Sequence, residues 1–264
     1  MRKYLQVISV YLRSELVWRT DATLTMVFSI TKIIFAYLLW GAIFAGKSEV
    51  SDFTFSSMLS YYIISSFLSQ IDMSAKVSNE LSNSVRKGTF SKYMTMPVRL
   101  QTYFLFMELG SILFYLGFDL ISALVWILIF QVDFVFTSNP LMIFSSIVMI
   151  LIGLYFMLQL NIYLGILSFK YLEIGTFLMI KNNLIVFVTG GIVPLALFPD
   201  AVIRLLKCLP FYYVTYLPSM LLIGRCESEA LLGIITISCW AIAFRILNQC
   251  AYQKYRIQFD GAGM

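Results

Sequence analysis

The stretch VTGGIVPLALFPDAVIRLLKCLPFYYVTYLPSMLLIG, residues 188–224, decides how the rest of this chain is arranged. It is apolar enough for a membrane interior, but glycines and prolines interrupt it at Gly190, Gly191, Pro194, Pro199, Pro210 and Pro218. Because proline removes a helical hydrogen bond and crowds the preceding turn, no single uninterrupted helix fits this pattern. Backbone without helical hydrogen bonds is tolerated at membrane depth only where protein buries it or water reaches it. The stretch therefore predicts short pieces packed between longer helices.

We interpret residues 194–224 as an outer re-entrant hairpin. Asp200 and Ser219 within it belong to the residue types whose side chains accept hydrogen bonds from the first turn of a helix. They predict N-caps for two short helices, over residues 201–209 and 220–224.

The composition indicates a membrane protein. Of the 264 residues, 60% are hydrophobic and 12% are charged, and the mean hydropathy is +0.85. This apolar share far exceeds that of an ordinary soluble domain. It predicts an all-α integral membrane protein, a single multi-pass domain over residues 1–264 that contacts the lipid bilayer.

Missing residue types exclude several kinds of site. The chain has no histidine, which excludes His-ligated metals and Ser/His or Cys/His nucleophile pairs. Its net charge is only +5, and its basic residues lie between apolar segments, so nucleic acid is not an expected partner. The four cysteines show no CxxC spacing. Cys208 and Cys226 either form an outer disulfide or stay free, and free apolar thiols are favoured.

The apolar segments predict six membrane-spanning helices. They are expected near residues 22–44, 53–71, 103–130, 141–169, 176–193 and 230–251. Ahead of the first span, residues 2–19 alternate between apolar and charged positions at helical spacing. The apolar positions are Tyr4, Val7, Ile8, Tyr11, Leu12 and Leu16, and Glu15 belongs to the charged set. This pattern predicts an amphipathic helix in the headgroup plane.

The distribution of lysine and arginine predicts the orientation, because short cytoplasmic loops collect positive charge. The N-terminal helix, the 72–101 loop, the loop at Lys170 and the C-terminal tail contain most of these residues. The opposite side holds Lys47, Arg204, Lys207 and Arg225. Both termini are therefore expected in the cytoplasm, and the interrupted stretch is expected to face outward.

The polar loop over residues 72–101 contains a short helical pattern. Val77, Leu81 and Val85 recur on one helical face, and Gly88 is a residue type that ends helices. Two interpretations of the apolar face are open. It packs under its own bundle or on lipid headgroups, or it docks into a groove of a soluble partner. In the second case the expected anchors are Phe90, Tyr93 and Met94.

Two motifs, taken with the span pattern, resemble a known family. Residues 85–90, VRKGTF, lead to Met96 and Pro97, and residues 190–199, GGIVPLALFP, are followed by LPF at 209–211 and YLP at 216–218. Their order and spacing resemble the permeases of type-2 ATP-binding-cassette exporters, the ABC-2 family, especially the six-span drug, bacteriocin and polysaccharide permeases. The resemblance extends over essentially the whole chain. Residues 261–263, GAG, and Ile235–Thr236 ahead of Trp240 depart from the usual pattern, so the subfamily stays open.

The resemblance implies an export permease of a bacterial-type cytoplasmic membrane, and not an enzyme. Residues 2–19 would form the elbow helix, and the 72–101 loop would supply a coupling helix that sits in a cleft of an ATPase subunit. The candidate coupling residues are Glu80, Leu81, Val85, Arg86, Lys87, Gly88 and Phe90. The outer segment, with the glycines and prolines named above, would close the pathway from outside.

The energy source is expected on other chains. This sequence contains no GxxxxGK[ST] phosphate loop, so it is expected to bind no cofactor. ATP and magnesium would be bound by two partner ATPase subunits. The permease would work as a dimer, either with a second copy or with a sister permease.

Charged residues inside the spans suggest an alternative. Lys32 lies near the centre of the first span and Asp119 well inside the third. Charges at mid-membrane are costly, so the two either pair to fix helix packing or line a polar pathway. A pathway of this kind would suit an ion- or proton-coupled secondary transporter. Glu108 and Lys181 are expected to be solvated residues at the inner membrane boundary. A lipid-modifying enzyme has little support, because no nucleophile lies beside a base.

Overall fold

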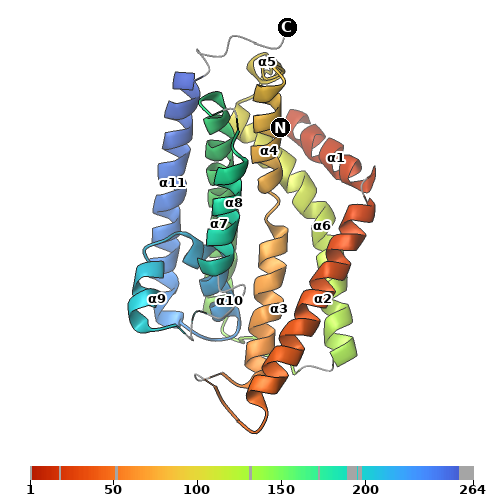
Figure 1. The fold of residues 1–264 in the computed structure, drawn as a ribbon, viewed down its shortest axis with the longest axis vertical. Coiled ribbons are helices and arrows are strands. Elements are labelled where there is room, and N and C mark those ends of the chain that lie inside the picture. The colour runs from red at the N-terminus through yellow and green to blue at the C-terminus, as the bar shows by residue number, and fades with distance from the viewer. Residues whose placement is uncertain are drawn as a thin grey trace.

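A computed structural model describes residues 2–17, 19–50, 53–130, 133–171, 173–188, 195 and 198–255, and the regular elements in these ranges are helices (Figure 1). They are α1 Arg2–Val17, α2 Arg19–Phe44, α3 Phe55–Ile71, α4 Ala75–Arg86, α5 Ser91–Met94, α6 Leu100–Phe130, α7 Pro140–Ile166, η1 Leu167–Phe169, α8 Gly175–Val188, α9 Asp200–Leu206, η3 Tyr212–Tyr216, α10 Leu217–Leu222, η4 Glu227–Glu229 and α11 Ala230–Tyr255. The all-helical prediction is confirmed for the described residues.

Four helical segments are long and apolar enough to cross a membrane: Thr20–Phe44, Leu100–Val125, Pro140–Phe169 and Glu227–Tyr255. They correspond to the first, third, fourth and sixth predicted spans. The second and fifth correspond to α3, with 17 residues, and α8, with 14. At 1.5 Å per residue, α8 extends about 21 Å, less than the roughly 30 Å of a hydrocarbon core. Six spans therefore remain a prediction.

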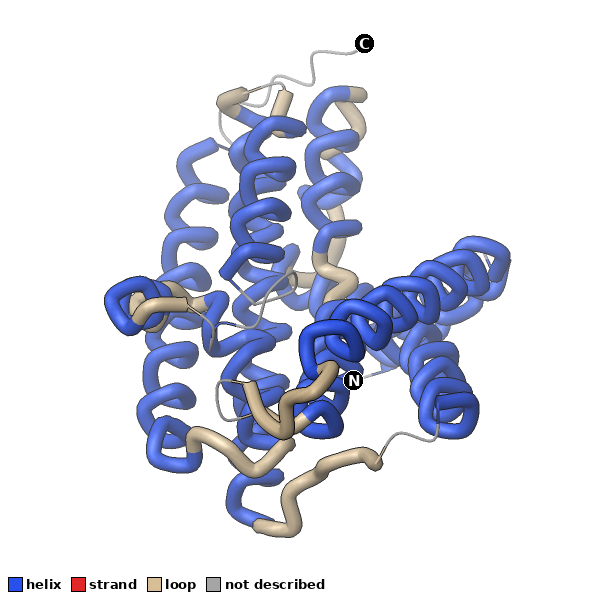
Figure 2. Tube along the Cα trace, turned by 60° about the horizontal axis from the view of Figure 1, so that its bottom comes forward, coloured by secondary structure: helices blue, strands red, loops and turns tan. Residues whose placement is uncertain are grey.

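The helices form an elongated bundle, and different segments of the chain lie at its two ends. One end, at the top of Figure 1, contains α4, α5, the start of α1 and the end of α11, and the opposite end contains the loop after α2 and the loop into α7. Figure 2 shows from a second direction that loops gather at the ends of the helices. The described parts of the segments predicted to be cytoplasmic thus lie together at one end of the molecule.

The interrupted stretch folds into short pieces, as predicted. Helix α9 lies on the outside of the bundle, and η3 and α10 follow each other without a gap between Tyr212 and Leu222. Pro218 sits in the first turn of α10, directly after the wider turns of the π-helix η3. A proline in a first turn needs no helical donor, which explains why the helical path continues there. Gly190, Gly191 and Pro194 lie outside the described residues.

The predicted caps of this segment are wrong. Pro199, and not Asp200, occupies the N-cap of α9, and no side chain caps that helix. Ser219 lies inside the continuous helical path and donates a hydrogen bond to the Thr215 carbonyl oxygen at 2.7 Å. The two helices over residues 201–209 and 220–224 become Asp200–Leu206 and Leu217–Leu222. The second helix begins at Leu217 and not at residue 220, because the π-helix ahead of Pro218 continues directly into it. Cys208 and Cys226 are both free.

Helix α1 packs along α6. Its Tyr4 ring stacks on Phe106 with centroids 4.7 Å apart, and the Tyr11 and Tyr103 hydroxyls lie 2.8 Å apart. Glu15 is buried, because Lys76 Nζ and Ser111 Oγ reach its Oε1 at 2.6 and 2.8 Å. Glu15, one of the charged positions of the predicted amphipathic helix, thus faces α4 and α6 and not solvent. The amphipathic helix itself is present, although its place relative to a membrane stays a prediction.

Candidate functional site

Helix α4 stands upright beside α7 and continues the line of α3 across a short break at residues 72–74 (Figure 1). Its apolar side faces the protein's own interior. Val77, Leu81 and Val85 are buried with Phe90, Tyr93 and the α7 residues Leu158, Ile162 and Ile166. The prediction that this face and its anchors Phe90 and Tyr93 meet a partner is therefore wrong. Burial of these side chains stabilises the bundle and leaves only Met94 of the three anchors exposed.

A glycine of α7 determines how closely α4 approaches. Leu81 is 0% exposed, and a Cβ atom added at Gly165 would lie 2.7 Å from both Cβ and Cδ1 of Leu81. Real Cβ atoms do not tolerate such a contact, so the two helices meet only because residue 165 is glycine. Helix α4 thus packs against α7 through a close contact between Leu81 and Gly165.

The exposed part of the loop is its polar tip. Gly88 has φ +68°, its N–H donates to the Val85 carbonyl at 3.1 Å, and the Thr89 N–H donates to the Ser84 carbonyl at 2.9 Å. This left-handed ending confirms the predicted helix stop. It leaves Arg86, Lys87 and Lys92 exposed at the end of the bundle. Arg86 Nη1 lies 3.3 Å from Glu173 Oε2 in an exposed ion pair, so α4 also contacts the loop before α8.

Glu80 joins α4 to α5. Its Oε1 accepts hydrogen bonds from Lys92 Nζ at 2.9 Å and from the Tyr93 hydroxyl at 2.8 Å. Burial alone would raise the pKa of Glu80, but these bonds and the charges of Lys92 and Lys87 hold the pKa below its ordinary value. Glu80 is half-buried and fully engaged within the loop, so its carboxylate holds the tip in shape.

Acid is expected to loosen this tip. A carboxyl whose pKa is lower in the folded than in the unfolded chain stabilises the fold above its unfolded pKa, about 4.3 for glutamate, and this stabilisation is lost as the pH falls through the folded pKa. Hydrogen-exchange protection factors of residues 87–96 should therefore fall on acidification below about pH 4.3. Glu80→Gln should show reduced protection at neutral pH and no acid step. Glu173→Gln is the control, and it should keep the acid step; its disappearance there would contradict the role of Glu80.

The intramembrane charges do not pair with each other. No ion pair or hydrogen bond joins Lys32 to Asp119, or Lys32 to any other described residue. Asp119 lies on the other side of Ile33 in a small pocket with Ser29 and Gln70, and its Oδ2 has no hydrogen-bond partner among the described residues. The predicted pair is therefore wrong, because Lys32 of α2 borders the cavity with α3 and α8, whereas Asp119 of α6 lies in a separate pocket.

A buried polar network crosses the break between α3 and α4. The Ser74 hydroxyl and N–H donate to Asp72 Oδ1, the N–H at 3.0 Å. Asn161 Nδ2 donates to Ser74 Oγ at 2.6 Å, and Lys181 Nζ donates to Asn161 Oδ1 at 2.9 Å. The expectation of a solvated boundary residue is wrong for Lys181, which joins α8 to α7. It is also wrong for Glu108, which is buried in α6.

Two cavities border this network along α8. One, of about 400 Å³, lies between α2, α3 and α8 and includes Asp72 in its wall. The other, of about 440 Å³, lies between α4 and α8 and is lined by polar residues. These polar residues are Ser78, Asn79, Lys181, Asn182 and Asn183. The network thus links the walls of an upper polar cavity and a lower, largely apolar one.

This network was not predicted, although the sequence contains two signals for it. Gln159 and Asn161 interrupt a mostly apolar helix, and Ser65, Ser69 and Asp72 follow each other at the i, i+4, i+7 spacing of one helical face. Such polar residues inside spanning helices usually face protein or a water-filled cavity.

A family model described as ABC-2 family transporter protein matches residues 30–263. The chain belongs to the ABC-2 transporter family. This identity makes it the membrane component of a transporter, and it agrees with the apolar helices. No curated protein matches the chain. This ABC-2 permease has two candidate functional features. The exposed tip of the 72–101 loop lies at one end of the bundle, and the two cavities lie along α8.

Proposed function

We propose that this permease exports a substrate across a bacterial-type cytoplasmic membrane, driven by separate ATPase subunits that bind the basic tip of the 72–101 loop. The observation behind the proposal is the tip itself. Arg86 and Lys87 are exposed at the end of α4, and Arg86 has 51% of its side chain accessible. The apolar side of α4 is meanwhile anchored in the bundle. A force applied at the tip would therefore reach the rest of the molecule.

The energy source must lie outside this chain. The sequence has no phosphate loop, so ATP and magnesium would be bound by the partner subunits. A groove of about 580 Å³ beside the tip offers additional contact area. Its wall includes Met94, Met96 and Arg99 together with Arg245 and Tyr252 of α11. Exposed methionines and arginines are typical of protein interfaces.

Movement of α4 would change the cavities. Helix α4 lines the upper cavity and follows α3, which lines the lower one, through the break at Asp72. A tilt of α4 about this break would change both cavities and the network between them, which suits a switch between inward-open and closed arrangements. Two ATPase subunits would each grip one such tip in a permease dimer.

Helix α8 supports the presence of a second permease copy or a sister permease. Asn182 and Asn183 are exposed in the middle of this apolar helix. Amide groups in contact with hydrocarbon are unfavourable, and transmembrane helices usually cover them with another helix or with water. A partner permease or a water-filled pathway at this face would satisfy them.

Charge reversal at the tip tests the proposal. Arg86→Glu with Lys87→Glu should abolish co-purification of an ABC ATPase from the native membrane and reduce ATP-dependent export by more than about tenfold, the effect of losing roughly 1.4 kcal/mol of binding free energy. The matched control reverses two exposed charges at the opposite end, Lys47→Glu with Arg204→Glu, and should retain both.

Two outcomes would overturn the proposal. Equal ATPase recovery from both double variants would show that the tip is not the docking site. Export that continues after ATP depletion and follows a proton gradient would instead support a secondary transporter that uses Lys32 or Asp119, since neither forms an ion pair within the described part of the chain.

A further inference from the structure

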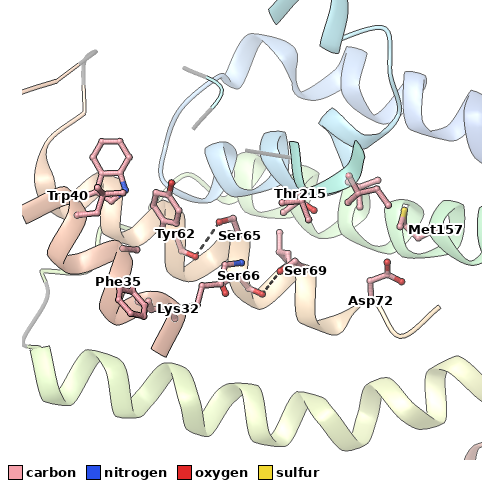
Figure 3. A pocket seen from close by; sticks show the side chains of 17 residues that line it. Lys32, Phe35, Trp40, Tyr62, Ser65, Ser66, Ser69, Asp72, Met157 and Thr215 are labelled. Carbon is pink, nitrogen blue, oxygen red and sulfur yellow. Dashed lines mark hydrogen bonds between the residues drawn. The ribbon is translucent and has the colours of Figure 1, made fainter. Parts of the chain in front are cut away.

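The wall of the lower cavity has an apolar part and a polar part. Much of its wall is apolar and includes the Trp40 and Tyr62 side chains. One side is polar, because Ser65, Ser66 and Ser69 of α3 face it together with Thr215 (Figure 3). Its volume of about 400 Å³ falls within the roughly 300–1,000 Å³ typical of small-molecule sites. A ligand that fits would combine an apolar body with a polar end.

Lys32 supplies the charge at this polar end. Its side chain extends from α2 toward the serines of α3 (Figure 3). It has no ion pair or hydrogen bond with any described residue. Asp72, the carboxylate in the same wall, is already engaged by Ser74 and interacts electrostatically with Lys181. The ammonium group of Lys32 is thus the uncompensated charge of this cavity.

Snorkelling does not explain Lys32. It lies 13 residues from Arg19 and 12 from Phe44, the two ends of α2. At 1.5 Å per residue the nearer end is about 18 Å away, much farther than a lysine side chain reaches. A lysine at this depth is expected to face a counter-charge or a functional cavity.

The cavity opens sideways. Phe35, Leu39 and Val186 lie on its rim, and they are 67%, 52% and 44% exposed. Because this rim is apolar, an entrance that opens to the bilayer here favours molecules that are already dissolved in hydrocarbon. Small hydrophilic anions would have to cross this rim from water.

We infer that the cavity binds a membrane-dissolved amphiphile whose anionic head, a sulfate, phosphate or carboxylate, pairs with Lys32 while its chain lies against Trp40 and Tyr62. Ser65 and Ser69 already donate to backbone carbonyl oxygens of α3, at 3.2 and 2.8 Å. The Ser66 hydroxyl is left to donate a further hydrogen bond to the same head. This inference deepens the proposed function by naming the ligand class, and it needs no ATPase to be tested.

Trp40 provides the readout. The chain has four tryptophans, and replacing Trp18, Trp126 and Trp240 with phenylalanine leaves only the one in the cavity wall. The full-length protein in phosphatidylcholine nanodiscs would be titrated with octadecyl sulfate brominated in mid-chain, whose bromines quench nearby indole fluorescence. The brominated octadecanol is the matched neutral probe. The sulfate should quench Trp40 at a concentration at least about tenfold lower than the alcohol.

Variants assign the preference to Lys32. Lys32→Gln should remove the difference between sulfate and alcohol, whereas Lys32→Arg and the loop control Lys47→Gln should keep it. Quenching of Lys32→Gln by the alcohol reports that the cavity is still folded. Equal quenching of the parent protein by both probes, or a preference that survives in Lys32→Gln, would overturn the inference.

Two further measurements distinguish an amphiphile that enters from the bilayer from an anion that enters from water. Millimolar inorganic sulfate should not displace the brominated sulfate, and displacement would indicate a plain anion site in place of an amphiphile site. Absence of quenching by both probes would mean that the cavity is closed to the bilayer, for example by a second copy, and would also overturn the inference. These results are independent of ATPase co-purification, so failure here leaves the proposed function standing.

Discussion

Gly165→Val is expected to unseat α4 and abolish ATP-driven transport. Any Cβ at residue 165 would lie 2.7 Å from two atoms of Leu81, which is itself fully buried, so valine forces the helices apart. Overpacking of this kind costs about 1–3 kcal/mol and occasionally more. The variant should unfold at a lower temperature in nanodiscs, and transport should fall to background, because the tip would no longer be anchored to α7.

A compensating substitution at Leu81 tests whether the clash with residue 165 causes the loss of stability. Leu81→Ala alone should cost about 2–5 kcal/mol by leaving a cavity. Combined with Gly165→Val, it should cost clearly less than the sum of the two single variants, because valine then fills the vacated space. Gly117→Val is the matched control, since a Cβ at residue 117 of α6 meets nothing within 4 Å. Equal loss of stability in the two glycine variants would contradict this close packing.

Asn161→Leu is expected to have the second largest effect. The Asn161 amide donates to Ser74 and accepts from Lys181, and its side chain is fully buried. Leucine would leave the Lys181 ammonium without this partner. Removing a hydrogen-bond partner from a partly buried charged group costs about 1–3 kcal/mol, because the group loses its solvation in the folded protein. Thermal unfolding of the purified permease should show this loss, and transport should stop.

A second substitution, at Lys181, shows whether the network is needed for transport or only for stability. Adding Lys181→Met to Asn161→Leu removes the orphaned charge, so stability should recover substantially, since apolar replacement of a whole buried polar group is often nearly neutral. Transport should stay absent if the network works as the gate between the two cavities. Gln6→Leu in α1 is the control, because this exposed glutamine forms no hydrogen bond within the described part of the chain and borders neither cavity. Recovery of transport in the double variant would show that the network only holds the helices together.

Helical membrane character was predictable from the sequence. Composition alone indicated long apolar helices, and four of them appear at the expected places. Local backbone rules also held where a residue type restricts its own conformation. Gly88 ends α4 in the left-handed region, and the prolines of the outer stretch prevent one long helix there. Pro218 was the exception, since a π-turn before it kept the helical path continuous.

The direction of each helical face was decided by tertiary structure. Periodicity correctly grouped Val77, Leu81 and Val85, but it states only which residues share a face and not which surface covers that face. Lys32 and Asp119 likewise looked like partners, because both lie deep inside apolar helices. The packing of α2 and α6 places them in different pockets, while Lys181 donates to Asn161, 20 residues away on α7. Hydropathy and proline content act within a few residues, so the sequence alone determined a helical membrane protein with an interrupted outer segment. Burial and charge pairing depend on how whole helices rotate against one another, and for that reason only the fold could decide them.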